Sequence, residues 1–398
     1  MKRRAFLLAS ATSGVAASRA AATERQGGDC PPDRCGPLPI ESVRIALGDS
    51  PCDVRLSSGA IPRYPFGLVR IRAAGTEGVG EGHVRDIAPL AAAVRGLVGQ
   101  DARGLDNLLP PNIPTPVGEA ISIALHDLVA RILGIPFHVL IGGAARGRVP
   151  LMPCIFANEP RAAGERAAEF AKAGFPGVKF KFFGEPALDV AVLEAVRGAT
   201  PAGRIVLADA NGGYRDPQAV RDLLPRCAAA GLDIVEDPLA SAGDDPFGDT
   251  AGLRGLTRVK IMLDIGVRKE GALAKAIRRG GADVINLHPN QQGSVSRTLR
   301  RAAAAETMGV PVWMGGTGSF GVQAAAWQQM AAVISTEMPC GEVGGSFDHG
   351  FSDDIVEAPY PLEGGAAILP DTPGLGVAID EAALQRMTLA EDYFDRPA

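Results

Sequence analysis

Several features that mark common classes of protein are scarce or missing in this chain. Its 40 basic residues are outnumbered by 45 acidic ones, and the resulting net charge of −5 argues against a nucleic-acid-binding surface. No hydrophobic run reaches the roughly 20 residues that a membrane-spanning helix needs. No fixed set of His and Cys residues accompanies Cys30 and Cys35, so a Cys/His metal site is not indicated. The composition therefore predicts a globular protein with no nucleic-acid partner and no membrane span.

The first residues are expected to be a leader that precedes the fold. Arg3 and Arg4 come before a short hydrophobic stretch, "AFLLASA", and an Ala-x-Ala pattern follows near Ala20. This arrangement resembles a twin-arginine export signal. We therefore expect residues 1–26 to be removed and the protein to be periplasmic or exported. A disordered basic tail is the alternative interpretation.

The 398 residues are too many for one simple core, so we expect two domains. Residues 38–90 are β-rich, because "IESVRIALG" and "GLVRIRAAG" alternate in polarity and "GTEGVGEGHV" supplies turns. The following "AISIALHDLVARILGIP" has hydrophobic residues at helical spacing, with Pro136 just past its end. Residues 27–147 therefore form a predicted α+β domain.

From about residue 149 the chain alternates between short β-branched runs and Ala-rich amphipathic runs. The strand candidates are "VPLMPCIF", "GVKFKFF", "RIVLADA", "LDIVEDP", "VKIMLDI", "ADVINLH", "VPVWMG" and a weak one at residues 341–343. Eight strands alternating with about seven helices predict a parallel α/β barrel over residues 148–350. An open doubly wound sheet is the alternative, but no glycine-rich phosphate turn follows "MPCIF". The turn-rich residues 351–398 are expected to return to the first domain.

Two lysines lie side by side on one predicted strand, "GVKFKFFG". Residues two apart on a strand share a face, so Lys179 and Lys181 project together and their like charges repel. Phe180 and Phe182 alternate with the lysines, so they are expected to face helices on the other side of the sheet. A solvated pair on an exposed strand is the alternative. The pattern favours a buried pair in which one amine is driven towards its neutral form.

Polar side chains end five consecutive predicted strands, at the edge where barrel active sites lie. Asp209, Glu236 and Asp264 are spaced 27 and 28 residues apart, one βα repeat each. Unpaired carboxylates gathered there would repel one another, and a hard divalent cation such as Mg²⁺ would remove that repulsion. The alternative is that each carboxylate caps a helix or pairs with an arginine. The register predicts a Mg²⁺ site made by these three residues.

These motifs together resemble the enolase superfamily, on its mandelate racemase and muconate lactonising side. The resemblance covers about residues 40–385 and is carried by "KFK", "ADAN", "IVEDP" and "MLD", supported by "GVGEGHV", "ALHDLVARILGIPFHVLIGG" and "PDTPGLGVAID". It implies a modified (β/α)7β barrel with an α+β capping domain, and an essential Mg²⁺. It also implies abstraction of a proton α to a carboxylate through an enediolate. We expect Lys181 to be the base and Lys179 to hold its pKa down.

The chain departs from the family pattern at two positions. The related enzymes with a lysine on each of two strands carry the second one where this chain has His288, and mandelate-racemase-like members use an Asp there with a His on strand seven, which is absent here. His288 is therefore either the second acid/base, which titrates in the right range, or a hydrogen-bond donor in a one-base reaction. The Glu that usually follows Asp264 is replaced by Ile265.

Substrate contacts are expected from the barrel edge and from loops of the first domain. The candidates are Asn211, Asp53, Arg55, Arg63 and Glu342. The leading hypothesis is racemisation or epimerisation of a small carboxylic acid by an enzyme that is a homo-oligomer by analogy with its family. A one-base dehydratase or cycloisomerase, a non-catalytic exported binding protein, and a lysine Schiff-base enzyme remain as alternatives.

Overall fold

The structure is a computed structural model that describes most of the chain after the leader. The described residues are 36–56, 59–240, 245–316, 318–335, 338 and 353–396. Of residues 53–56 and 59–60 it describes the backbone alone. The predicted export signal therefore lies outside the described residues.

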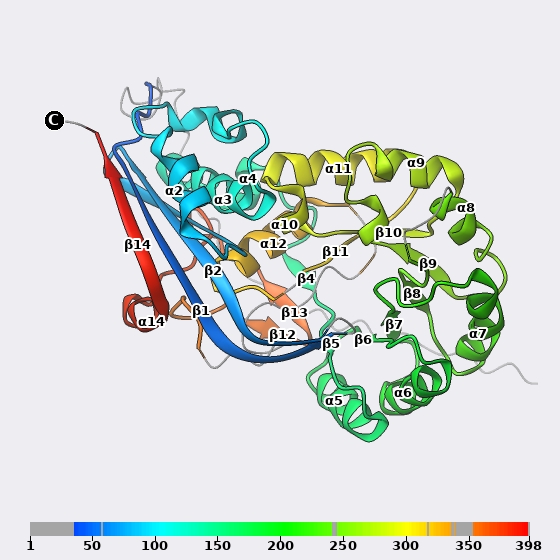
Figure 1. Ribbon diagram of the computed structural model, residues 1–398. Coiled ribbons are helices and arrows are strands. Elements are labelled where there is room, and N and C mark those ends of the chain that lie inside the picture. Colours follow the sequence, from blue (N-terminus) through cyan, green and yellow to red (C-terminus); the bar gives the residue numbers. More distant parts are fainter. Residues whose placement is uncertain are drawn as a thin grey trace, which may run out of the picture. The chain divides into compact units, whose positions relative to one another are not determined.

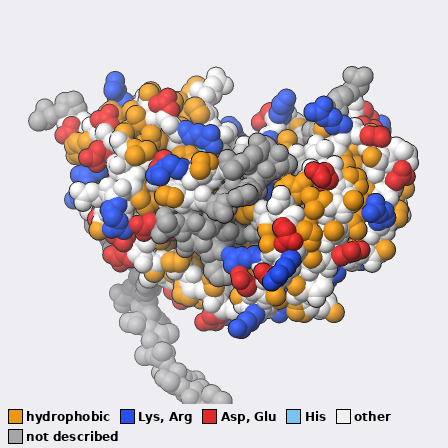
Figure 2. All heavy atoms as spheres, turned by 60° about the horizontal axis from the view of Figure 1, so that its bottom comes forward, with side chains coloured by type: hydrophobic (Ala, Val, Ile, Leu, Met, Phe, Trp, Pro, Cys, Tyr) orange, Lys and Arg blue, Asp and Glu red, His pale blue; other side chains and the backbone are white. Residues whose placement is uncertain are grey.

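No described helix is both long and hydrophobic enough to cross a membrane. On the face that Figure 2 presents, acidic and basic side chains are interspersed, with hydrophobic ones between them.

A four-stranded antiparallel sheet covered by helices forms the first domain (Figure 1). Its strands, in sheet order, are β14 (Thr388–Asp395), β1 (Ser42–Leu56), β2 (Gly59–Ala73) and β3 (Thr76–Gly82). The helical segments that follow are α2 (Ile87–Arg95), η1 (Ala102–Leu108), α3 (Thr115–Leu133) and α4 (Phe137–Leu140). This order confirms the β-rich and then helical pattern of the sequence. Strand β14 pairs antiparallel with β1, so residues 388–395 lie in the first sheet.

Three glycines of β3 bring this strand directly against α3. A Cβ atom added to Gly78, Gly80 or Gly82 would lie 2.1–2.3 Å from the nearest backbone atom of α3. The prediction that "GTEGVGEGHV" supplies turns was wrong for most of this stretch, because the turn is confined to residues 74–75. The alternating glycines instead allow a helix to approach the strand closely.

Seven parallel strands form the second sheet, and each pairs with its neighbour in sequence (Figure 1). They are β5 (Cys154–Ile155), β6 (Gly177–Lys181), β7 (Ile205–Asp209), β8 (Ile234–Glu236), β9 (Lys260–Leu263), β10 (Val284–Leu287) and β11 (Val312–Met314). A doubly wound sheet reverses its strand order in the middle, whereas this order runs straight from β5 to β11. The predicted barrel class with an α+β capping domain is therefore confirmed.

The connecting helices lie on the outside of this curved sheet (Figure 1). They are α5 (Pro160–Lys172), α6 (Pro186–Ala199), α7 (Pro217–Ala229), α8 (Pro246–Ala251), α9 (Ala272–Arg279) and α11 (Val295–Thr307). The first four of them begin with proline. Proline fits the first helical position because an N–H group there would have no partner within the helix, so its absence costs no hydrogen bond. Local sequence thus sets where these helices start.

The first predicted barrel strand, "VPLMPCIF", is divided between two sheets. Its first part is β4 (Arg148–Pro150), which pairs with β13 (Ala366–Ile368), and β13 pairs in turn with β12 (Leu362–Glu363). Only β5 joins the parallel sheet. Pro153 lies between the two parts and has no N–H to donate to a ladder, although its carbonyl accepts from the Lys179 N–H. The eighth predicted strand, at residues 341–343, lies outside the described residues.

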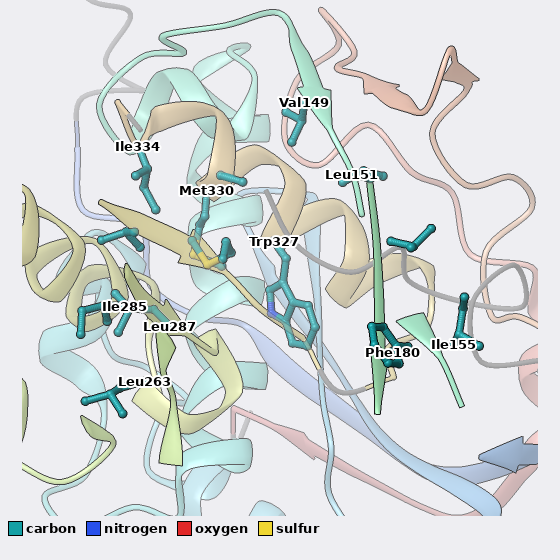
Figure 3. Packing of buried hydrophobic residues seen from close by; sticks show 14 of the residues in the cluster. Val149, Leu151, Ile155, Phe180, Leu263, Ile285, Leu287, Trp327, Met330 and Ile334 are labelled. Atoms are coloured by element: carbon teal, nitrogen blue, oxygen red, sulfur yellow. The ribbon is translucent and has the colours of Figure 1, made fainter. Parts of the chain in front are cut away.

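The two faces of the parallel sheet carry different side chains, which alternate along each strand. Residues facing the barrel interior form one hydrophobic cluster, and those facing the helices belong to another, larger one that extends into the capping domain. The interior cluster contains Leu207, Ile234, Met262, Val284 and Trp313. Figure 3 shows residues of the larger cluster, among them Ile285 and Leu287 of β10 and Trp327 and Met330 of α12 (Gly321–Val333). The residue two places after an interior position therefore also faces the interior.

Two buried glutamates join the capping domain to α12. Helix α12 has no side-chain cap of its own, and Glu81 of β3 accepts from the N–H groups of Phe320 and Gln323 at 2.8 and 2.9 Å. Glu119 of α3 accepts from the Gln323 amide and the Trp327 indole, each at 2.7 Å. Burial raises the pKa of both carboxyl groups to about 8, although these hydrogen bonds oppose the shift.

This raised pKa predicts that stability falls as the pH rises. The folded chain holds a proton on Glu119 that the unfolded chain, with an ordinary pKa near 4.5, has released. The contribution of this carboxyl group to the free energy of unfolding is fully present below the unfolded pKa of about 4.5. It is lost as the pH rises to about 8, at up to about 1.4 kcal/mol per pH unit. We expect urea unfolding between pH 5 and 8 to show a shallower loss of stability in Glu119→Gln than in the unmodified protein.

The matched control is Glu165→Gln, because Glu165 lies on α5 with 63% of its side chain exposed. Its pH dependence is expected to equal that of the unmodified protein. An unchanged slope in Glu119→Gln would show that the carboxyl group is ionised in the folded protein at neutral pH.

Candidate active site

The predicted site residues lie at the carboxyl edge of five neighbouring strands. Lys179 and Lys181 are on β6, Asp209 ends β7 and Glu236 ends β8. Asp264 and His288 directly follow β9 and β10. All six are buried, with Lys181 the most exposed at 6%. Parallel strands in this register bring their carboxyl ends together, so the residues converge in one interior cluster.

The two lysines meet at one carboxylate oxygen. Lys181 Nζ lies 2.7 Å and Lys179 Nζ 3.1 Å from Asp209 Oδ2. Burial alone would raise the pKa of Asp209, but the charges of both lysines outweigh it and hold that pKa below its usual range. The alternative of a solvated pair on an exposed strand is therefore wrong. The ammonium groups are instead kept close by a shared counter-charge.

Lys179 also links two of the predicted metal ligands. Its Nζ lies 3.0 Å from Glu236 Oε2, and it lies over the Trp313 ring at 5.0 Å from the centroid. Burial raises the pKa of Glu236 well above its ordinary value, and the charges of Asp209 and Asp264 raise it further while Lys179 opposes them. These mutual effects place the three predicted ligand carboxylates within one electrostatic cluster.

Asp264 is held by groups on both of its sides. Asp237, which follows Glu236 in sequence, accepts from the N–H groups of Asp264 and Ile265 at 3.1 and 2.9 Å. Burial and the charge of Asp264 raise the pKa of Asp237 to about 7. The Asp264 carboxylate itself accepts from Arg268 Nε at 3.1 Å and from Arg268 Nη2. Asp237 thus fixes the backbone, and Arg268 binds both carboxylate oxygens.

His288 lies beside the metal-ligand candidates. Its Nε2 is 3.4 Å from Asp264 Oδ2 and 3.1 Å from Asn286 Nδ2. The Asn286 amide also donates to Glu236 Oε1 at 2.8 Å. A Cβ atom on Gly315 would lie 2.2 Å from Asn286 Oδ1 and 2.6 Å from His288 Nε2. A larger residue at that position would have to displace these two side chains.

The donor set is one that a divalent cation could use. Ligand atoms of Glu236, Asp264 and His288 all lie within 4.8 Å of one another. Asp209 is a neighbour of this group, but its carboxylate is bound by the two lysines. Two carboxylates and an imidazole fit a divalent metal, with Asp209 adjoining them.

The expected substrate contacts fall in different places. Asn211 donates its N–H to Asp209 Oδ1 at 2.9 Å and its amide to Oδ2 at 3.1 Å, so it orients Asp209. Arg63 is half-exposed and pairs with Asp49. The side chains of Asp53 and Arg55, and all of Glu342, lie outside the described residues.

Sequence reasoning missed three residues of this cluster. Asn286 is two residues before His288, so the two-residue period of a strand would have placed it on the same face. Trp313 faces the interior by the same rule. Arg268 is four residues after Asp264, across the short helix η2 (Ile265–Val267), a spacing that brings side chains together.

Comparison with known proteins identifies the family of this barrel and its capping domain. The model of the enolase C-terminal domain-like family matches residues 162–383, more than half of the chain. The chain therefore belongs to this family, and the predicted resemblance to the enolase superfamily is confirmed.

Two curated relatives extend over nearly the whole chain. The N-succinylamino acid racemase of Thermus thermophilus is 29% identical over 379 residues, covering 89% of this chain and 98% of that protein. The chloromuconate cycloisomerase of Pseudomonas putida is 27% identical over 385 residues, covering 89% and 100%. Both are enzymes, in agreement with the prediction that this chain is one.

A solved structure supports the fold alone. The N-succinyl Arg/Lys racemase of Bacillus cereus has a TM-score of 0.80 at 23% identity, and the match covers 89% of this chain and 99% of that one. The barrel and capping domain of the two proteins are therefore arranged alike.

The contacts of Lys179 predict how the cluster responds to loss of one charge. Lys179→Met leaves Asp209 and Glu236 without the ammonium between them, and we expect the free energy of unfolding to fall by about 3–5 kcal/mol. A bound cation would replace that charge, so MgCl2 should stabilise this variant more than the unmodified protein. Urea unfolding with and without MgCl2 measures both effects.

Lys172→Met is the matched control, because Lys172 is exposed on α5. Its stability and its response to MgCl2 should equal those of the unmodified protein. A Lys179→Met variant that is as stable as this control, or that MgCl2 leaves unchanged, would contradict the arrangement of charges.

Proposed function

We propose that the protein catalyses the Mg²⁺-dependent abstraction of a proton α to the carboxylate of a small acid. The immediate product is an enediolate, and the main outcome is racemisation or epimerisation. The observation that carries this proposal is the position of Lys181, an amine at the carboxyl edge of the barrel beside a second lysine and a cluster of buried carboxylates. The activities of the curated relatives support the same class of reaction.

We assign the metal to the carboxylates of Asp209, Glu236 and Asp264, with His288 next to them. The bound cation would stabilise the second negative charge that develops on the substrate carboxylate. Lys179 lies between Asp209 and Glu236, so a cation held by these two carboxylates would displace its ammonium. The displaced ammonium would then be available to contact the substrate carboxylate.

Lys181 is proposed to remove the α-proton. An amine accepts a proton only when it is neutral, and positive charges close to Lys181 disfavour its protonated form. Lys179 supplies such a charge because both side chains reach the same oxygen of Asp209. Release of Asp209 from Lys181 would also remove the contact that stabilises the ammonium.

His288 is proposed to return a proton from the opposite face, which inverts the α-carbon. It follows β10, whereas Lys181 is on β6, so the two groups approach the barrel interior from different strands. Imidazole exchanges protons near neutral pH, as this role requires.

The contacts of His288 also favour a second candidate, a one-base cycloisomerase or dehydratase. Its imidazole is near Asp264 and Asn286, which would keep it at the metal ligands and away from the substrate. One relative is itself a cycloisomerase. In this reaction Lys181 is the base and no inversion follows.

Exchange of the α-proton in D2O separates these reactions. Both enantiomers of a set of acids, including N-succinylamino acids and muconolactone, are incubated with Mg²⁺ and followed by NMR. We expect Lys181→Ala to lower exchange by about 10²–10⁴-fold, the usual contribution of a general base. We expect His288→Ala to keep exchange of one enantiomer and to lose interconversion of the two.

Lys172→Ala serves as the control and should exchange like the unmodified protein. Exchange that survives Lys181→Ala would remove the base assignment. Interconversion unaffected by His288→Ala would remove the two-base reaction. No exchange of any acid by a protein that binds Mg²⁺ would favour the binding-protein alternative.

A further inference from the structure

Each predicted metal ligand is neutralised by a cationic side chain of this chain. Lys179 and Lys181 contact Asp209, and Lys179 contacts Glu236. The third ligand, Asp264, is paired with Arg268, whose Nε lies 3.1 Å from Oδ1 and whose Nη2 donates to Oδ2. Both oxygens of Asp264 are therefore already bonded before any cation arrives.

The segment that carries Arg268 is held in place from two directions. Asp237 accepts the N–H groups at its start, as described above. At its end, Arg301 of α11 donates to the carbonyl of Val267, the residue before Arg268. The Asp264 side chain is 3% exposed and that of Arg268 is 30% exposed. The pair thus belongs to an anchored turn and not to a loose surface contact.

The charge of Arg268 is permanent. Burial disfavours the charged guanidinium, but the hydrogen bond to Asp264 and the charges of Asp264, Asp237 and Glu236 outweigh burial and raise the pKa of Arg268 from its ordinary value. A lysine can lose its proton when a metal approaches, whereas a guanidinium does not. A cation bound to Asp264 therefore always meets a second positive group on the same carboxylate.

We infer that Arg268 competes with the divalent cation for Asp264 and so sets the metal affinity of the site. This rests on the proposed function only in that the cluster takes a divalent cation. A cation at Asp264 would either replace a hydrogen bond from Arg268 or share a carboxylate oxygen with it, and both arrangements place the guanidinium next to the new charge. The residue after Asp264 is Ile265, so no carboxylate at that position offsets the charge of Arg268.

The test measures Mg²⁺ binding by titration calorimetry with the full chain and no substrate. Hydrogen bonds to a charged group contribute enough that their loss changes an equilibrium about 10- to 100-fold. We expect Arg268→Met to bind Mg²⁺ tighter by about that factor. Arg268→Lys keeps the charge but cannot form the two parallel hydrogen bonds. Its Mg²⁺ affinity should therefore lie between that of the unmodified protein and that of Arg268→Met.

Arg279→Met is the matched control, since Arg279 is an exposed arginine that pairs with Asp245. Its Mg²⁺ affinity should equal that of the unmodified protein. Circular dichroism shows whether each variant is folded, and Arg268→Lys decides the matter if Arg268→Met does not fold.

Unchanged or weaker Mg²⁺ binding in the Arg268 variants would overturn the inference, and would show that Arg268 only supports its ligand. Absence of Mg²⁺ binding in every protein would overturn it as well. Tighter binding without proton exchange on any acid would leave the inference standing and remove the proposed function. Proton exchange with unchanged metal affinity in the Arg268 variants would overturn the inference and leave the proposed function standing.

Discussion

The confinement of opposite charges inside a barrel is the constraint on which this site depends. Four buried carboxylates, Asp209, Glu236, Asp237 and Asp264, lie within mutual electrostatic range. Such charges are costly in the interior unless they are paired. Lys179, Lys181 and Arg268 supply the pairs, and a divalent cation would supply two further charges. The two lysines are therefore both counter-ions of the resting protein and its proposed catalytic groups.

The fold positions these groups by simple alternation along the strands. Leu207 and Ile234 face the barrel interior and belong to its hydrophobic layer. Two residues further along the same strands, Asp209 and Glu236 face the same interior at the carboxyl edge. The hydrophobic layer closes the barrel below the site. The capping domain is tied to the other end of this core by Glu81 and Glu119, and Trp327 packs under Gly316 just after β11. Stability and site geometry thus share one core.

Much of this architecture follows from sequence alone, because strand polarity and βα spacing are local. The seven described barrel strands and the convergence of Asp209, Glu236 and Asp264 were predictable from register. What was not predictable depends on packing and geometry. Pro153 divides the first strand, and the glycines of β3 serve helix packing where turns were expected. Arg268 was missed because a pairing across a short helical turn is only evident once that turn is known.

Electron density from a crystal grown with Mn²⁺ would test the central claim most directly, since Mn²⁺ replaces Mg²⁺ at oxygen sites and is located by its anomalous scattering. The account predicts one anomalous peak bound by Asp209, Glu236 and Asp264, with Lys179 turned away from Asp209 and Glu236. Carboxylates still paired with Lys179 and Arg268, with no anomalous peak in the barrel at saturating Mn²⁺, would contradict it.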